Sequence, residues 1–187
     1  MRRSRADAAE TRRKVVRAAS ELLRARGRDG MSVADVMAAA GMTPGGFYKH
    51  FEDKDALLEE SFDAASNESV VHGRRAAEAA PRGRALRTVV RAYLSMAHRD
   101  DAAHGCPLAA CVSDAPHAGK GFRRAFTAGL HRMLDGITEA AVRDGRPLGR
   151  PQAMALVASL VGAVTLARAT HDDALAAQLL EAVADLW

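Results

Sequence analysis

The sequence predicts an all-α protein in which a three-helix head (residues 1–52) precedes a six-helix body (residues 53–187). Two features of composition support this fold class: alanine is abundant, and aromatic residues make up only 4% of the chain. A third is the pattern, because apolar residues recur three and four positions apart while proline and glycine fall between these runs. A chain of this length suffices for one sizeable core, or for a small module built onto a larger one.

Two short helices joined by a tight turn are predicted in the head. Ser32 is suited to cap the first of them, because the Asp35 carboxylate three residues on can complete a capping box. Gly41 ends this helix, since glycine adopts the left-handed cap conformation without Cβ strain. Thr43 then stands at the N-cap of the second helix and Pro44 at its first position, where a missing N–H is not needed. This layout is that of a helix-turn-helix, a motif whose second helix enters the DNA major groove.

The side chains after this turn divide into buried and projecting groups. Phe47 and Phe51 are four apart and are expected to enter a small core. Tyr48, Lys49 and His50 project elsewhere, as a hydroxyl, a cation and an imidazole able to meet phosphate groups. The pattern therefore indicates a surface that binds the DNA backbone.

Basic charge is concentrated in the head. Residues 1–54 hold 12 Lys or Arg against 7 Asp or Glu, whereas residues 55–187 hold 15 against 16. Lys54 follows Asp53, a predicted N-cap, so its ammonium and the free N–H groups of the next helix could share one phosphate. Residues 1–10 form a charged, basic arm that could fold onto DNA or stay mobile. This distribution is expected when the head meets phosphate and the body does not.

The stretch AGMTPGGFYKHFEDKDAL (residues 40–57), with the capped helix before it, resembles the DNA-binding signature of the TetR family of bacterial repressors. The motif is long, specific at many positions and near the N-terminus, and it covers about the first third of the chain. The resemblance implies a ligand-responsive homodimeric repressor that binds a palindromic operator in double-stranded DNA. It also implies that a small-molecule effector binds the body, and that the helix beginning at residue 55 links the body to the head.

The residues predicted to bind DNA lie in the turn, the recognition helix and the helix starts around them: Thr11, Ser32, Thr43, Pro44, Gly45, Gly46, Tyr48, Lys49, His50 and Lys54. Lys49 is the long polar side chain of the recognition helix that could reach a guanine O6 or N7 edge. Gly45 and Gly46 let the backbone approach the bases but offer no side-chain donor, and Ala34 stands where many TetR relatives carry a polar reader. We therefore expect modest direct readout of bases and more reliance on operator spacing and DNA shape.

Helical periodicity predicts six body helices and one helix at the start of the head: residues 55–73, 85–99, 106–112, 122–143, 151–169 and 171–187, and residues 11–26. The helix at 151–169 is apolar nearly all round and needs cover on more than one side. Its small residues, such as Ala158 and Gly162, would let another helix approach closely. The resemblance implies that the last two helices pair with those of a second chain, which would place two recognition helices about 34–36 Å apart. The alternative is that 151–169 is the central core helix of a monomer.

Large side chains and one cysteine of the body are candidates for effector binding or sensing: Phe62, Tyr93, Met96, Cys106, Phe122, Phe126 and Met133. Placing a pocket among them depends on the family resemblance, since such stripes are also typical of a plain core.

For Cys106 the sequence suggests a more specific hypothesis, that its thiol senses reactive molecules. A thiol at a helix N-terminus is favoured as a thiolate, and sequences similar to its Gly-Cys-Pro-Leu context occur in a TetR branch that includes sensors of electrophiles and oxidants. Cys106 is therefore either a sensing thiol or, like Cys111, a small buried hydrophobe. A zinc set of both cysteines with His104 and His117 is disfavoured, because the spacing matches no standard structural site. No metal or cofactor is expected.

Other function classes are disfavoured by what the sequence lacks. No Gly-rich phosphate loop, G-x-S-x-G or H-E-x-x-H occurs, which argues against an enzyme. A non-specific architectural DNA-binding protein is the nearer alternative, and competition by random DNA would separate it from a repressor. No apolar stretch follows the basic start as in a signal peptide, and the apolar run at 153–167 is too short to span a bilayer. A cytoplasmic protein that does not bind membranes is therefore expected, in a reducing compartment that suits two unpaired cysteines.

Overall fold

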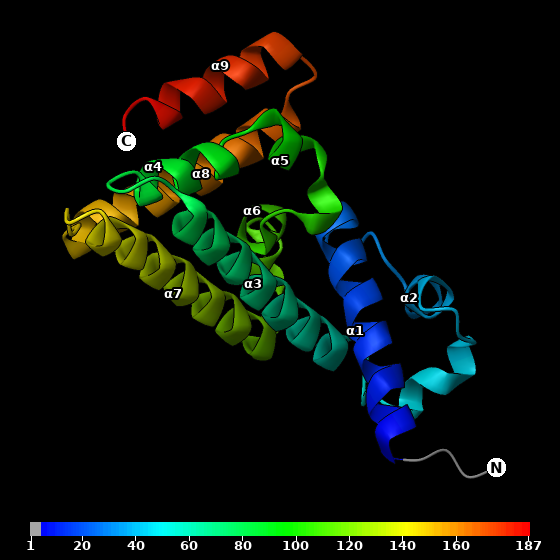
Figure 1. The fold of residues 1–187 in the computed structure, drawn as a ribbon. Coiled ribbons are helices and arrows are strands. Elements are labelled where there is room, and N and C mark those ends of the chain that lie inside the picture. Colours follow the sequence, from blue (N-terminus) through cyan, green and yellow to red (C-terminus); the bar gives the residue numbers. More distant parts are fainter. Residues whose placement is uncertain (1–4) are drawn as a thin grey trace.

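The computed structural model describes residues 5–187, which form helices joined by short turns and contain no strand (Figure 1). The all-α fold class, with a helix-turn-helix head and a helical body, is confirmed. The basic arm expected at residues 1–10 lies partly outside the described residues. Its remainder forms the first turns of α1 (Arg5–Arg26), so the first helix begins earlier than the predicted residue 11. Alanines and an acidic first-turn residue, Asp7, favour this longer helix.

The head packs α1, α2 (Val33–Ala39) and the 3-10 helix η1 (Pro44–Lys49) around one small core. Side chains from all three are buried there, together with one just beyond η1: Val15, Ala19, Leu23, Val36, Met37, Phe47 and Phe51. Phe47 and Phe51 stack with ring centroids 5.6 Å apart, as their spacing predicts. The recognition helix therefore forms where expected but as 3-10 turns, because its two glycines lower α-helical propensity.

The long helix α3 (Lys54–Ala79) joins the head to the body and packs against both α1 and α7 (Lys120–Arg143). Asp53 caps it as predicted, accepting a hydrogen bond from the Ala56 N–H at 2.7 Å. The helix continues beyond the predicted end near residue 73, since Gly73 weakens a helix without removing a backbone hydrogen bond. It ends at Ala80, whose extended backbone suits the residue before Pro81.

The helix expected at 85–99 is wrong as a single element. The chain instead forms α4 (Ala85–Tyr93) and α5 (Met96–Asp100), because Leu94 leaves the helical conformation with a ψ of 55°. The Ser95 hydroxyl accepts a hydrogen bond from the His98 N–H at 3.2 Å and donates one to the Ala92 carbonyl at 2.9 Å. One hydroxyl thus bridges both sides of the break. The body at residues 54–187 contains seven α-helices instead of six.

The last helices form the far end of the molecule. The short α6 (Pro107–Cys111) lies inside the body. In the view of Figure 1, α8 (Arg150–Ala169) runs behind α4, and α9 (Asp173–Ala184) lies on the outer side of α8, far from η1. By length and composition alone α8, with 20 residues and a mean hydropathy of 1.5, could cross a membrane, but core helices of soluble proteins have the same properties. Its apolar character is explained by packing on one face, where Leu156, Leu160 and Val164 are completely buried.

Candidate nucleic-acid interface and ligand cavity

The turn between α2 and η1 is fixed by local hydrogen bonds. The Ser32 N–H donates to the Asp35 carboxylate at 2.8 Å and the Asp35 N–H donates to Ser32 Oγ at 3.1 Å, which forms the predicted capping box. The Ser32 hydroxyl also donates to the Asp35 carboxylate at 2.6 Å, and this bond together with the one from the Ser32 N–H holds the pKa of Asp35 below its usual range. Gly41 adopts a φ of 72°, and the Met42 N–H bonds to the Met37 carbonyl at 2.8 Å. The direction in which η1 leaves α2 is therefore set by a few adjacent residues.

Close packing holds η1 against α2. A Cβ added at Gly46 would lie 3.4 Å from Met37 Cε, which is about van der Waals contact with the flexible end of that side chain. Thr43 occupies the N-cap position with extended backbone, but its hydroxyl makes no capping hydrogen bond to η1. Pro44 stands at the first position of η1, as predicted.

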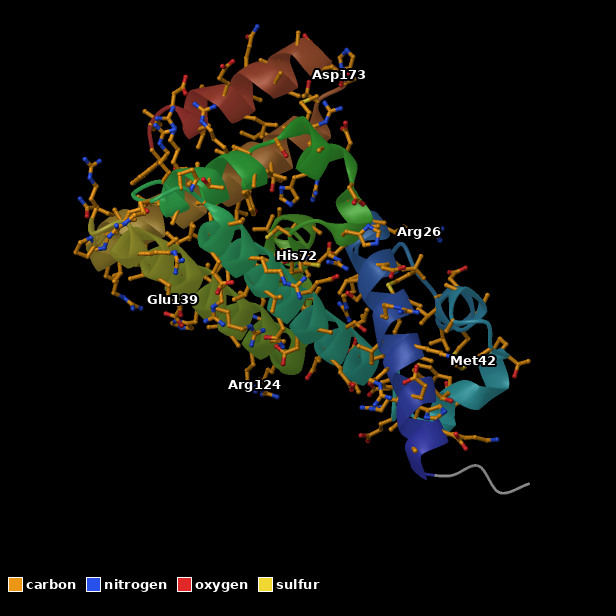
Figure 2. All side chains as sticks on the ribbon, in the orientation of Figure 1. Arg26, Met42, His72, Arg124, Glu139 and Asp173 are labelled. Carbon is orange, nitrogen blue, oxygen red and sulfur yellow. The ribbon has the colours of Figure 1, made fainter. Side chains whose placement is uncertain are left out.

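The residues predicted to bind DNA lie mostly on one projecting part of the head, whose tip is marked by Met42 in Figure 2. Those that are exposed are Ser32, Thr43, Pro44, Gly45, Tyr48 and Lys49, and those that are half-buried are Thr11, Gly46, His50 and Lys54. Tyr48 is 77% exposed although the edge of its ring packs on Phe47, with centroids 5.2 Å apart. Phe47 in the core thus anchors a segment whose polar side chains face solvent.

Lys54 has a partner within the protein. Its Nζ donates to the Arg28 carbonyl at 3.0 Å, and the Arg28 guanidinium pairs with the Asp55 carboxylate at 2.9 Å. These contacts connect the loop after α1 to the first turn of α3. The predicted phosphate contact of Lys54 stays a prediction, and in this conformation the ammonium first serves to position that loop.

Arg12 has a structural role that the sequence does not indicate. Its guanidinium lies over the Phe51 ring, 4.2 Å from the centroid, and donates to the His50 carbonyl and to the Glu60 carboxylate. The side chain therefore connects α1, the end of η1 and α3. Sequence spacing could not find this role, because the partners are 38 and 48 positions away.

A cavity of about 220 Å³ lies in the body between α3, α4, α7 and the segment that precedes α6. Its wall is mainly apolar and includes Val89, Ile137 and Leu160. Three of the seven predicted effector residues line it: Tyr93, Cys106 and Met133.

The other four predicted effector residues do not line this cavity. Phe62 packs against Phe122 and Phe126, with centroids 5.3 and 5.6 Å away, and forms an aromatic cluster between α3 and α7. Met96 is partly buried against the core. Helical spacing could not separate these residues from the cavity wall, because a core stripe and a pocket stripe have the same period.

His98 organises one side of the cavity. Its Nε2 accepts a hydrogen bond from the Cys106 N–H at 3.0 Å, and its Nδ1 lies 2.6 Å from the Tyr93 carbonyl. These partners assign the neutral tautomer with the proton on Nδ1, since a backbone N–H needs an acceptor and a carbonyl needs a donor. Burial lowers the pKa of His98. Sequence analysis did not single out this residue.

Both cysteines are buried and unpaired. Cys106 stands before a helix of five residues, which is too short to provide the full dipole invoked for a thiolate. Burial raises the pKa of Cys111 to about 12. The disfavoured zinc set is not assembled, since His104 instead pairs with Asp101 at 2.9 Å and no group of three metal-ligating side chains occurs within the described residues.

Contacts reach from the cavity wall to the head. The Arg24 guanidinium on α1, almost fully buried, pairs with the Glu68 carboxylate of α3 at 2.9 Å and donates to the Gly105 carbonyl at 3.4 Å. The Arg28 N–H donates to the Asp114 carboxylate at 2.8 Å. The end of α1 is thus bonded to the segments on both sides of α6, one of which carries Cys106.

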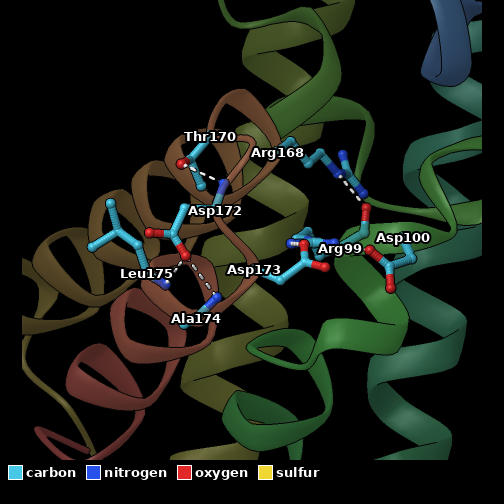
Figure 3. Close-up of polar contacts among 8 residues, drawn as sticks. All are labelled: Arg99, Asp100, Arg168, Thr170, Asp172, Asp173, Ala174 and Leu175. Atoms are coloured by element: carbon cyan, nitrogen blue, oxygen red, sulfur yellow. Dashed lines mark hydrogen bonds and ion pairs between the residues drawn. The ribbon is translucent and has the colours of Figure 1, made fainter.

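A second set of contacts joins the cavity side to α9 (Figure 3). Arg99 pairs with Asp173 at the start of α9 at 2.7 Å, while Arg168 of α8 donates to the carbonyls of His98 and Arg99 at 2.9 and 3.1 Å. The short α5 is therefore held between the cavity and the last two helices.

Comparison with known families agrees with both parts of the chain. Residues 15–61 match the family described as bacterial regulatory proteins, tetR family. Residues 83–184, more than half of the chain, match the C-terminal domain of LmrA/YxaF-like transcriptional regulators.

Individual relatives support the same assignment. The chain is 43% identical over 54 residues to the HTH-type transcriptional repressor BepR of Brucella suis, a match that covers 29% of this chain and only 26% of that protein. The fold resembles a TetR family regulator from Cytophaga hutchinsonii, with a TM-score of 0.78, 22% identity, and coverage of 100% of this chain and 96% of that one. A TetR family regulator from Agrobacterium tumefaciens gives a TM-score of 0.79 at 20% identity, over 95% and 97% of the two chains.

Proposed function

Because the chain belongs to the TetR family of transcriptional regulators, we propose that it is a homodimeric repressor that leaves a palindromic operator when an effector binds its body. A regulator of this family binds DNA and is not an enzyme. The observation that supports the proposal most directly is the recognition segment, where Tyr48 and Lys49 are exposed while Phe47 anchors the segment in the head core. Repression, as opposed to activation, is favoured by the similarity to the repressor BepR. We place the protein in the cytoplasm, because a bacterial regulator would encounter its operator there.

The proposed dimer uses α8 and α9. Large apolar side chains are exposed on both helices: Met154, Leu166 and Leu175, with Leu186 just after α9. Next to them α8 presents Ala158 and Gly162, whose small size suits close helix approach. Exposed apolar surface gathered on two adjacent helices favours burial against a second copy, which would place two recognition segments on one operator.

The proposed effector site is the cavity lined by Tyr93, Cys106 and Met133. Hydrogen bonds join its wall to α1 through Arg24 and its α5 side to α9 through Arg99, so occupancy could change both the head and the dimer. An effector shifts the operator-binding population only by its differential affinity for the two states. A covalent electrophile is a second candidate effector, favoured by the position of Cys106 in the cavity wall.

Operator binding is tested with DNA from the region upstream of the chain's own gene. We expect a two-to-one complex of protein and duplex that survives excess random DNA, measured by fluorescence anisotropy with sedimentation to give the stoichiometry. Equal competition by random DNA would instead support a non-specific architectural protein. Absence of binding at low salt would refute the proposal.

The electrophile alternative is tested on the same complex. If Cys106 is the sensing thiol, N-ethylmaleimide releases the operator from the wild type but not from a Cys106→Ser variant. Equal release from both proteins, or from neither, contradicts a role of Cys106 in sensing.

A further inference from the structure

Two buried hydroxyls line the cavity without a hydrogen-bond partner. Ser66 is 4% exposed, and neither its Oγ nor the Oη of Tyr93 forms a hydrogen bond within the described residues. Burial raises the pKa of Tyr93, and the nearby Cys106 thiol, which is only a weak hydrogen-bond partner, adds to this. Buried polar groups normally have partners, so two buried hydroxyls without a good partner, on residues that line one cavity, point to a ligand with polar atoms.

Two titratable side chains that line the cavity pair with carboxylates, whereas Arg168, close to Tyr93 and Cys106, bonds only to backbone carbonyls. Arg74 makes two hydrogen bonds to Glu139, at 2.8 and 2.9 Å, and His104 pairs with Asp101. Both ring nitrogens of His98 are used by backbone groups. The paired groups of the cavity wall therefore offer an ionic ligand no counter-charge, and burying a charge in a mainly apolar site is unfavourable.

A phenol hydroxyl donates a hydrogen bond more readily than it accepts one, and a serine hydroxyl can also donate. We propose that the cavity binds a small, neutral and mainly apolar molecule that carries a carbonyl oxygen, with Tyr93 and Ser66 as its polar contacts. This inference rests on the proposed role of the body as an effector domain and names the chemical class of the effector. The apolar remainder of the ligand packs against the aliphatic wall.

The wall also offers a position from which the cavity can be filled. A Cβ at Gly136 of α7 meets nothing within 4 Å, although the residue lines the cavity. At Gly129, in contrast, a Cβ would lie 2.7 Å from Ser66 Oγ and 2.9 Å from the Phe62 ring. Gly136→Leu should therefore place a large side chain in the cavity without a clash at Cβ. Gly136→Ala is its control, because it removes the same helix-interior glycine but adds only one methyl group.

The test uses acetophenone as the probe and α-methylstyrene as its counterpart of nearly the same shape, in which a methylene replaces the carbonyl oxygen. Benzoate serves as the anionic probe. We expect acetophenone to bind the full-length dimer about three- to tenfold more tightly than α-methylstyrene, as one neutral hydrogen bond allows. Benzoate should bind more weakly than the ketone. Binding is measured by ligand-observed NMR titration.

Variants assign the preference to the two hydroxyls. Tyr93→Phe or Ser66→Ala should reduce the ketone preference, whereas Ser61→Ala should not, although Ser61 is also a buried, unpartnered serine of α3, because it lies outside the cavity wall. Gly136→Leu should block all three probes while Gly136→Ala keeps them. Thermal unfolding confirms that each variant folds, and Tyr93→Phe should not lower stability since it removes an unpaired hydroxyl.

Equal binding of ketone and alkene, tighter binding of benzoate, or no binding of any probe would overturn the inference. So would a loss of preference in Ser61→Ala equal to that in Ser66→Ala. Operator binding is measured on the same samples without a probe. Intact operator binding with a failed probe result refutes the ligand class alone, whereas absent operator binding refutes the proposed function.

Discussion

At the scale of single residues, burial decides which thiol can react. Cys111 is completely buried and its pKa is raised to about 12, so almost no thiolate forms near neutral pH. We predict that Cys111 in a Cys106→Ser variant resists iodoacetamide at pH 8 in the folded protein and reacts readily in denaturant. Mass spectrometry after timed quenching measures the modification. Alkylation of the folded variant at the denatured rate would contradict the burial of this thiol.

Lys49 and Lys54 are expected to differ in what they contribute to DNA binding. Lys54→Ala should weaken all sequences alike and reduce the slope of log affinity against log salt by about 1, because one phosphate contact is lost. Lys49→Ala should instead change the relative affinity for operators that differ at guanine positions. Anisotropy titrations at several salt concentrations measure both, with Lys120→Ala on α7 as the control. Since Lys54 also bonds to the Arg28 carbonyl, thermal unfolding must show that the variant head is intact. A change in sequence preference on Lys54→Ala would overturn its assignment.

At the scale of elements, the sequence best predicts those helix ends and turns that are determined by a few adjacent residues. The capping box of Ser32 and the glycine end of α2 involve neighbours within three or four positions, and both are confirmed. The break after α4 was missed because Ser95 is tolerated in a helix interior, and the sequence pattern alone does not show that its hydroxyl caps α5 at the His98 N–H. The cavity was only partly predicted for the same reason. Tertiary packing decides which side of an apolar stripe faces open space.

The link between α5 and the chain before α6 depends on a neutral His98. Its pKa is lowered chiefly by burial and also by Arg168, while the Tyr93 carbonyl and Asp101 oppose this. The unfolded chain therefore takes up a proton near pH 6.5 that the folded protein does not, so the free energy of unfolding falls as the pH drops below 6.5. We predict that His98→Gln flattens this dependence between pH 6.5 and 5, by at most about 1.4 kcal/mol per pH unit.

Urea denaturation at a series of pH values measures the effect. His131→Gln, which removes an exposed imidazole, is the matched control and should leave the slope unchanged. Identical slopes for the wild type and His98→Gln would show that this histidine titrates alike in both states.

At the scale of the whole molecule, the proposed function requires two heads held at a fixed separation. The head and α9 lie at opposite ends of the subunit, with Met42 and Asp173 far apart in Figure 2. The proposed interface on α8 and α9 must therefore act on DNA through rigid elements, α3 and α1 above all. Buried contacts such as Arg24 with Glu68 and Gly105 provide that rigidity, because they bond α1 to α3 and to the cavity wall.

Leu166 provides the decisive test of this arrangement, since it is a large apolar residue of α8 that is 58% exposed in the single chain. In a dimer, Leu166→Glu would place one negative charge from each subunit in the proposed interface, where neither charge finds a partner. The fold of the single subunit should lose little, because the side chain is already largely exposed there. We predict a folded monomer whose operator affinity falls about 100-fold or more, because each head then binds without the gain from its tethered partner. Sedimentation equilibrium and anisotropy measure the two effects. Val71→Glu, at an exposed valine of α3 away from α8 and α9, should remain dimeric with unchanged affinity. A Leu166→Glu protein that stays dimeric would show that the two heads are joined through another surface.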